Sequence, residues 1–238
     1  ISLISSKKML PPSADHFFGT DTFGRDVFSR VISAARIDLL VAIVSIGFAF
    51  IIGIIIGSIA AYFKGVTDSI LMRFIDIVQS CPQFILGMAL AAALGPGHRN
   101  LIIVLTVIMT PGFARLVRSR ILSLRELPFV DAARSGGIPT MRIIFVSLVP
   151  NSLGPILVAV SLSISYAMLD VAGLSFIGLG FKPPQAEWGM MISKGMNNML
   201  AGEWWVSLFP GLALFLSVLG FNLLGDGLRD IIDPRMRK

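Results

Sequence analysis

The chain has 238 residues, of which 55% are hydrophobic and only 14% charged, and its mean hydropathy is +0.82. This composition leaves too little charged surface for a water-soluble domain of this size, so it indicates a lipid bilayer as the solvent. The net charge of +6 lies in patches between apolar runs, which fits loops beside anionic lipid and argues against a nucleic-acid partner. The single cysteine, Cys81, excludes an internal disulfide framework.

Five apolar segments approach the length of a membrane-spanning helix, which needs about 20 mostly apolar residues. In chain order they are Leu39–Tyr62, Ile70–Leu94, Leu101–Leu116, Leu153–Ala172 and Trp205–Leu224. We therefore expect an all-α, polytopic transmembrane helical bundle. It divides into an N-terminal periplasmic or interfacial segment (1–36), a transmembrane core (37–228) with loops at 115–150 and 173–205, and a cytoplasmic tail (229–238).

The distribution of lysine and arginine among the loops predicts the orientation of the chain. Twelve of these cations lie in the Phe63–Arg73 loop, the Arg115–Pro150 loop and the C-terminal tail, whereas the other two inter-span loops hold only Arg99, Lys182 and Lys194. The positive-inside rule places the first three segments in the cytoplasm. The cations of the N-terminal segment oppose this assignment, and one further helix preceding that segment would explain its translocation.

Two residue pairs predict particular helix contacts. Gly53 and Gly57 form a Gly-x-x-x-Gly step in the first predicted span, which permits the close approach of another helix. Arg73 and Asp76 are three residues apart at the start of the second span, so they are expected to form an ion pair on one helical face.

The Arg115–Pro150 segment is long for a connection between two spans, and its middle has helical character. Asp131 lies near the start of a short helix, where the helix dipole favours negative charge, and Ala132 and Ala133 give that helix a smooth face. Gly137 permits a sharp turn after it. Such a helix suits docking into a groove of a soluble partner, but a solvated surface helix explains the same pattern equally well.

Motifs along nearly the whole chain resemble those of ABC importer permeases. Asp131-Ala132-Ala133-x-x-x-Gly137, followed by Pro150-Asn151, resembles the Glu-Ala-Ala loop of that family, with Asp for the usual Glu and Ser147 where many members carry His. Other segments resemble the dipeptide, oligopeptide and nickel branch, specifically its second, C-type permease subunit: Gly19-Thr20-Asp21-x-x-Gly24-Arg25-Asp26, Leu174-Ser175-Phe176-Ile177-Gly178-Leu179-Gly180 with Trp188-Gly189, and Gly225-Asp226-Gly227-Leu228-Arg229-Asp230.

The resemblance implies a type I ABC importer permease fold in the cell inner membrane, without enzymatic activity of its own. In that family the loop forms a coupling helix in a cleft of the ATPase subunit, which implies that role for Asp131, Ala132, Ala133, Gly137 and Ile138. The implied partners are a homologous second permease subunit, two subunits that bind the ATP, and an extracytoplasmic solute-binding protein. The solute stays open among peptides, glutathione-like compounds, nickel and metal chelates.

Asp170, an ionisable residue, lies near the outer end of the fourth predicted span, in an otherwise apolar stretch. Because such a group is costly in lipid, it is a candidate for lining the translocation pathway together with Met168, Ser175 and Phe176. An interfacial carboxylate that reaches lipid headgroups or a neighbouring helix explains Asp170 as well.

Several catalytic and nucleotide-binding motifs are missing from the sequence. It contains no Gly-x-x-x-x-Gly-Lys-Ser/Thr phosphate loop, no His-Glu-x-x-His and no Gly-x-Ser-x-Gly. His16 and His98 are too far apart in the sequence to suggest a local metal site. Two other functions make different demands on the sequence: an ion-driven secondary transporter predicts inverted repeats, and an intramembrane enzyme needs paired catalytic groups at membrane depth.

Overall fold

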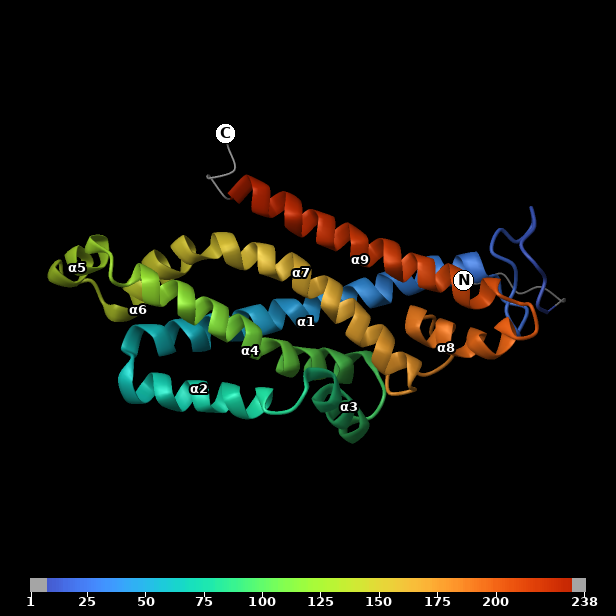
Figure 1. Cartoon of the computed structure of the whole chain (residues 1–238), viewed down its shortest axis with the longest axis horizontal. Helices are drawn as coiled ribbons and strands as arrows, with labels where there is room; N and C mark the ends of the chain where they lie inside the picture. Colours follow the sequence, from blue (N-terminus) through green and yellow to red (C-terminus); the bar gives the residue numbers. More distant parts are fainter. Residues whose placement is uncertain (1–7, 233–238) are drawn as a thin grey trace. The chain divides into compact units, whose positions relative to one another are not determined.

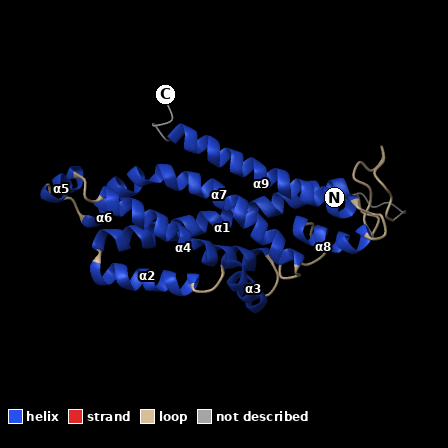
Figure 2. Ribbon diagram, viewed as in Figure 1, coloured by secondary structure: helices blue, strands red, loops and turns tan. Residues whose placement is uncertain are grey.

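A computed structural model describes residues 8–232, and within that range the ordered elements are helices without a β-strand (Figures 1 and 2). Residues 1–7 of the predicted N-terminal segment and 233–238 of the predicted tail lie outside it. In chain order the elements are α1 (Val27–Phe63), α2 (Gly65–Gln79), α3 (Gln83–Leu94), α4 (His98–Leu124), α5 (Pro128–Ser135), α6 (Thr140–Arg142), the π-helix η1 (Ile143–Leu148), α7 (Val149–Phe176), α8 (Trp188–Met199) and α9 (Trp205–Ile232).

The chain divides into two compact units. Unit 1 holds the described residues up to Ser45, together with Gly87–Val104 and Ile164–Phe221. Unit 2 holds Ile46–Leu86, Leu105–Ser163 and the described residues from Asn222 onwards. Helices α1, α4, α7 and α9 each contribute residues to both units, so the division cuts across the long helices.

The described residues contain four helical segments long and apolar enough to cross a bilayer, or five if the bent pair of α2 and α3 counts as one span. The four are α1, α4, the continuous stretch Thr140–Phe176, and α9. This confirms the predicted polytopic all-α bundle. The predicted second span, Ile70–Leu94, corresponds to the bent pair and is not one continuous helix, because α2 and α3 meet at 82°. Pro82 explains the break, since proline lacks an N–H and disfavours helical backbone at the residue before it.

Several helices continue beyond the predicted spans into charged sequence. Helix α4 runs through Arg115 as far as Leu124, and the fourth span begins at Thr140 rather than Leu153. The charges are tolerated because they find partners: the Arg118 guanidinium donates two hydrogen bonds of 2.6 Å to the Asp68 carboxylate on α2. The connection between these long helices is therefore shorter than the predicted 115–150 loop, whose cytoplasmic position stays a prediction.

The Gly-x-x-x-Gly step of α1 faces α4 within unit 2. A Cβ atom at Gly53 would lie 2.5 Å from the Phe113 Cβ, and one at Gly57 would overlap the Ala114 carbonyl. Any side chain at either position would push the two helices apart. The predicted close approach is confirmed.

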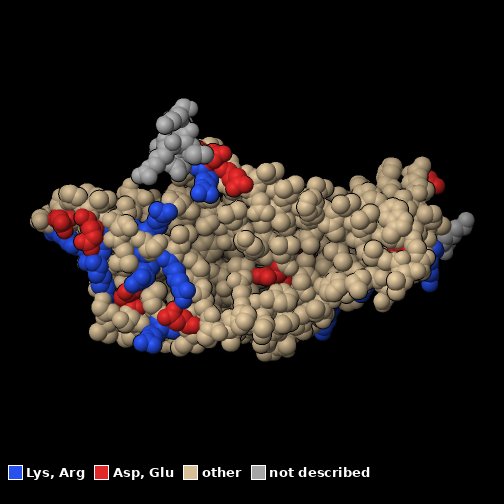
Figure 3. All heavy atoms as spheres, viewed as in Figure 1, with Lys and Arg blue, Asp and Glu red and all other residues tan. Residues whose placement is uncertain are grey.

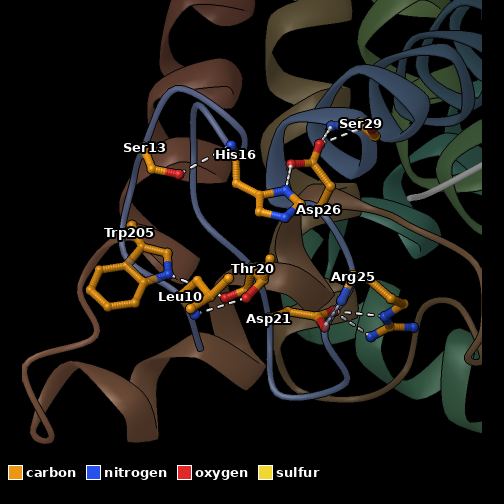
Figure 4. A network of polar contacts seen from close by, with 9 residues as sticks. All are labelled: Leu10, Ser13, His16, Thr20, Asp21, Arg25, Asp26, Ser29 and Trp205. Atoms are coloured by element: carbon orange, nitrogen blue, oxygen red, sulfur yellow. Dashed lines mark hydrogen bonds and ion pairs between the residues drawn. The ribbon is translucent and has the colours of Figure 1, made fainter. Parts of the chain in front are cut away.

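The segment before α1 is held to unit 1 by a polar network (Figure 4). Asp26 caps α1 by accepting 2.8 Å hydrogen bonds from the Ser29 backbone N–H and hydroxyl, and its other oxygen lies 3.0 Å from His16 Nδ1. Although burial raises the pKa of Asp26, the bonds from Ser29 and His16 hold it below its ordinary value. The Trp205 indole N–H donates to the Thr20 carbonyl at 3.2 Å. This network accounts for the acidic and small residues of the motif that begins at Gly19.

Two buried carboxylates fix the start of α8 in unit 1. Glu187 is fully buried and caps α8 by accepting hydrogen bonds from the N–H groups of Gly189 (2.7 Å) and Met190 (2.8 Å). Asp38 of α1, 2% exposed, accepts from the Trp188 N–H at 3.1 Å. The predicted 173–205 loop therefore contains a well-anchored helix.

We expect the stability of the solubilised protein to fall as pH rises from about 4.5 to about 7. Burial raises the pKa of Glu187 from 4.5 to about 7, so over this window the folded state binds a proton that the unfolded chain releases. The loss is at most ~3 kcal/mol, or several degrees in Tm.

Glu187→Gln keeps an oxygen for capping but cannot titrate, so its Tm should vary less with pH than that of the wild type. Glu203→Gln, in the same outer region, is the matched control and should keep the wild-type slope. Thermal unfolding followed by intrinsic fluorescence across this pH range measures both. If the Tm of Glu187→Gln changed with pH as steeply as that of the wild type, Glu187 would not be the group that titrates.

Candidate coupling site

Both ends of α5 are set by its sequence. Pro128 occupies the first turn, where its missing N–H has no intrahelical partner to lose. After the helix, Gly137 adopts a φ of +75° and donates its N–H to the Arg134 carbonyl at 3.0 Å, while the Ile138 N–H donates to the Ala133 carbonyl at 3.1 Å. These two bonds form a Schellman motif, which favours glycine at this position. The sharp turn predicted at Gly137 is therefore present.

Helix α5 is largely exposed to its surroundings. Val130 is its buried residue, whereas the Asp131 side chain is 70% exposed and Phe129 and Ile138 are each 40% exposed. Figure 3 shows lysine, arginine, aspartate and glutamate side chains gathered over the end of unit 2 that carries α5 and α6. An exposed helix with apolar side chains among charges provides both contact area and orientation for a protein partner.

Two arginines attach α5 and the turn before it to the C-terminal end of α1. The Arg134 guanidinium lies 5.2 Å from the Tyr62 ring centroid, and its Nε is 3.4 Å from the Tyr62 hydroxyl. Arg125 donates to the carbonyls of Ala61, at 3.0 Å, and of Tyr62, and its guanidinium lies 5.7 Å from the same ring. Arg125 therefore satisfies carbonyls in the last turn of α1, and both guanidinium groups lie against the Tyr62 ring.

A further ion pair joins the same two segments at the surface. Lys64 Nζ lies 2.7 Å from Glu126 Oε1, and the nearby ammonium holds the pKa of Glu126 below its ordinary value. Both side chains are exposed, so solvent screens the pair and it adds little stability. The anchoring of α5 therefore depends on the arginine contacts with Tyr62.

The predicted coupling residues lie together on α5 and its C-terminal turn, whereas the predicted pathway residues do not form one exposed set. Met168 and Ser175 of α7 are buried within unit 1, at 1% and 3% exposure. Asp170 is half-buried, and Phe176, at the end of α7, is 37% exposed. Their role in a pathway stays a prediction.

The ion pair predicted within α2 is wrong. Asp76 Oδ1 pairs with Arg115 Nη2 of α4 at 2.5 Å, and not with Arg73. The i,i+3 rule considers one helix alone, and here a neighbouring helix supplies a better-placed cation. The buried acids Asp38 and Glu187 were not predicted either, although both are acids beside apolar sequence.

Comparison with known proteins gives the family. Residues 53–238 match the family model described as binding-protein-dependent transport system inner membrane component. The chain is 44% identical to the dipeptide transport system permease protein DppC of Alkalihalophilus pseudofirmus, over 98% of this chain and 76% of that protein. It is 43% identical to the probable D,D-dipeptide transport system permease protein DdpC of Escherichia coli K12 (96% and 76%) and 40% identical to the glutathione transport system permease protein GsiD of Pectobacterium atrosepticum (95% and 75%).

Chains of solved ABC transporter structures have the same fold as this chain. A subunit of the MetNI methionine ABC transporter superposes with a TM-score of 0.67 at 21% identity, covering 86% of this chain and 97% of that one. A chain of an amino acid ABC transporter gives 0.65 at 15% identity, with 86% and 94% coverage. The apolar helices, the shared fold and the extent of identity lead to one conclusion: the chain belongs to the family of binding-protein-dependent inner membrane transport components, as a multi-pass C-type permease of the peptide branch of ABC importers.

Proposed function

We propose that this permease couples ATP hydrolysis on separate subunits to solute uptake, with α5 as the helix that contacts an ATP-binding subunit. The observation that carries the proposal is the exposed α5 with its arginine anchor on α1. Asp131, Ala132 and Ala133 lie on the helix, and Gly137 and Ile138 form the turn that ends it.

Two routes lead from α5 into the long helices of unit 2. Through Arg125 and Arg134, a displacement of α5 acts on the end of α1 at Tyr62. In the other direction α5 continues through α6 into η1, the π-helix Ile143–Leu148, and then α7. π-helical turns are rare and are often found at functional sites. We infer that η1 changes its conformation when α5 moves, whereas the arginine contacts make the end of α1 move together with α5.

The proposed assembly contains this chain, a homologous second permease subunit, two ATP-binding subunits that hold the ATP, and an extracytoplasmic solute-binding protein. Family membership supports this composition in general. Closure of the ATP-binding subunits would displace α5 and expose the pathway outward, and hydrolysis would reset it.

We propose a short peptide as the solute. The relatives named for dipeptides, D,D-dipeptides and glutathione support this choice. Nickel or a metal chelate is the less supported alternative. Four methionines of α8 could contact a metal. Met190 and Met191 are buried at 6% and 5% exposure, which fits packing, while Met196 and Met199 are 52% and 48% exposed.

Ala133→Asp and Gly137→Asp test the coupling role of α5. The first places a charge on the face expected to meet the partner, and the second forces a side chain into left-handed backbone. Each should lower uptake in proteoliposomes at least about tenfold, the equivalent of ~1.4 kcal/mol, while the complex still hydrolyses ATP.

Ala133→Ser is the matched control, because it places a small side chain at the same position without the charge and should transport close to wild type. Immunoblotting establishes that all variants reach the membrane. Normal uptake by both Ala133→Asp and Gly137→Asp would exclude α5 as the coupling helix. Transport driven by an ion gradient without ATP would exclude the coupling function itself.

Tyr62→Leu tests the anchor separately from the docking surface. It removes the ring on which Arg125 and Arg134 stack, a contact worth about 0.5–1 kcal/mol per pair at an exposed site. ATP-binding subunits should still co-purify, since the exposed face of α5 is unchanged, but more ATP should be hydrolysed per solute transported. Tyr62→Phe retains the ring and should stay close to wild type. Equal ATP-to-solute ratios in Tyr62→Leu and wild type would show that the contact of Arg125 and Arg134 with Tyr62 does not transmit the movement of α5 to α1.

A further inference from the structure

A polar cavity lies in unit 2 where the chain breaks between α2 and α3. Its volume is about 470 Å³, within the range of about 300–1,000 Å³ that is usual for small-molecule sites. Asp76, Arg115, Gln79 and Gln83 supply its polar lining, and Cys81 lies at the break itself. Backbone that leaves the helical pattern within a broken span is tolerated when it lines a cavity, because water or a ligand can then satisfy its polar groups.

The Asp76–Arg115 ion pair in this cavity is more exposed than the Asp68–Arg118 pair on the same two helices. The side chains of Asp76 and Arg115 are 56% and 51% exposed although both belong to candidate spanning helices. Asp68 and Arg118 also join α2 to α4, but they are 17% and 33% exposed and do not line the cavity. Charges within spanning helices are costly unless they face water or a polar partner. The Asp76–Arg115 pair is therefore placed to exchange its internal contact for a charged ligand.

The ends of α2 and α3 place one partial negative and one partial positive charge beside the Asp76–Arg115 pair. The C-terminal end of α2, which contains Gln79, carries partial negative charge, and the N-terminal end of α3 at Gln83 carries partial positive charge. Broken spanning helices bind charged groups of solutes through such ends. The Gln83 amide already donates a 3.5 Å hydrogen bond to the Met109 sulfur, and the amides of Gln79 and Gln83 both carry the donor and acceptor groups that a peptide bond requires.

We propose that this cavity binds the two charged ends of a short zwitterionic peptide. The peptide ammonium is held by Asp76, and its carboxylate by Arg115 and the N-terminal end of α3. In the empty cavity the two side chains neutralise each other, which lowers the cost of keeping both charges within the spanning region. The inference rests on the proposed transport of peptides and adds the position in this chain at which the solute is held.

Cys81 offers a direct measurement, because it is the single cysteine of the chain, is exposed, and lines the cavity. The assembled transporter in proteoliposomes, without its solute-binding protein, is treated with N-ethylmaleimide, and modification of Cys81 is followed by mass spectrometry. Millimolar Ala-Ala should slow the modification severalfold. N-acetyl-Ala-Ala and Ala-Ala amide, which each lack one charge, should need at least about tenfold higher concentrations for the same protection.

Variants at the pair assign each end of the peptide. In Asp76→Asn, Ala-Ala and N-acetyl-Ala-Ala should protect Cys81 at the same concentration. In Arg115→Gln, Ala-Ala and Ala-Ala amide should do so. Asp68→Asn removes the neighbouring pair and should retain both differences.

Three results would overturn the site: no reaction of Cys81 in the assembled transporter, equal protection by all three peptides, or full discrimination in both Asp76→Asn and Arg115→Gln. If any of these occurs while ATP-driven peptide uptake persists, the proposed function stands and the site alone is wrong. If the wild-type complex shows no ATP-driven peptide uptake, the proposed function fails.

Discussion

The contact between two arginines and the end of one long helix is the interaction on which a coupling role depends. Helix α5 is exposed and short, so by itself it could move without consequence for the rest of the chain. Arg134 stacks on Tyr62, and Arg125 bonds the last carbonyls of α1. These groups are cations at a helix C-terminus, where they also interact favourably with the helix dipole. A force on α5 therefore acts on a helix that is 37 residues long.

Charged side chains also hold other helices of the molecule in place. A chain that is 55% hydrophobic can keep few charges away from water, and several of those among the described residues hold helices in place. Glu187 and Asp38 hold the start of α8, Asp26 caps α1, and Arg118 joins α4 to Asp68. The accessible Asp76–Arg115 pair differs from these because it lines a cavity. Its place in the cavity, together with its accessibility, is the physical reason to assign it to a ligand rather than to the scaffold.

Hydropathy and motifs predicted much of this architecture. The all-α fold and the close approach at Gly53 and Gly57 follow from local sequence, because apolar length and small residues act within one or two helices. The short helix at Asp131 and the turn at Gly137 were predictable for the same reason, since proline and glycine set both ends. The coupling role of those residues came from resemblance and is still to be tested.

What the sequence could not supply depends on contacts between distant residues. Helix ends were underestimated because hydropathy falls at the first arginine, whereas α4 continues to Leu124 once Arg118 meets Asp68, 50 residues away. Arg115 displaced Arg73 as the partner of Asp76 because it approaches from another helix. The break at Pro82 was visible in the sequence but was outweighed by the apolar run around it. Asp38 gains its role only when Trp188, 150 residues later, is packed against it.

Cross-linking from α5 in the assembled transporter tests the central claim most directly. A photoreactive amino acid at Ala132, on the exposed face of α5, is irradiated in the membrane, and its cross-linked partner is identified by mass spectrometry. The account predicts a cross-link to an ATP-binding subunit that strengthens or weakens when ATP is bound. Cross-links to lipid alone, or to no other polypeptide, in a complex that still transports its solute would contradict it.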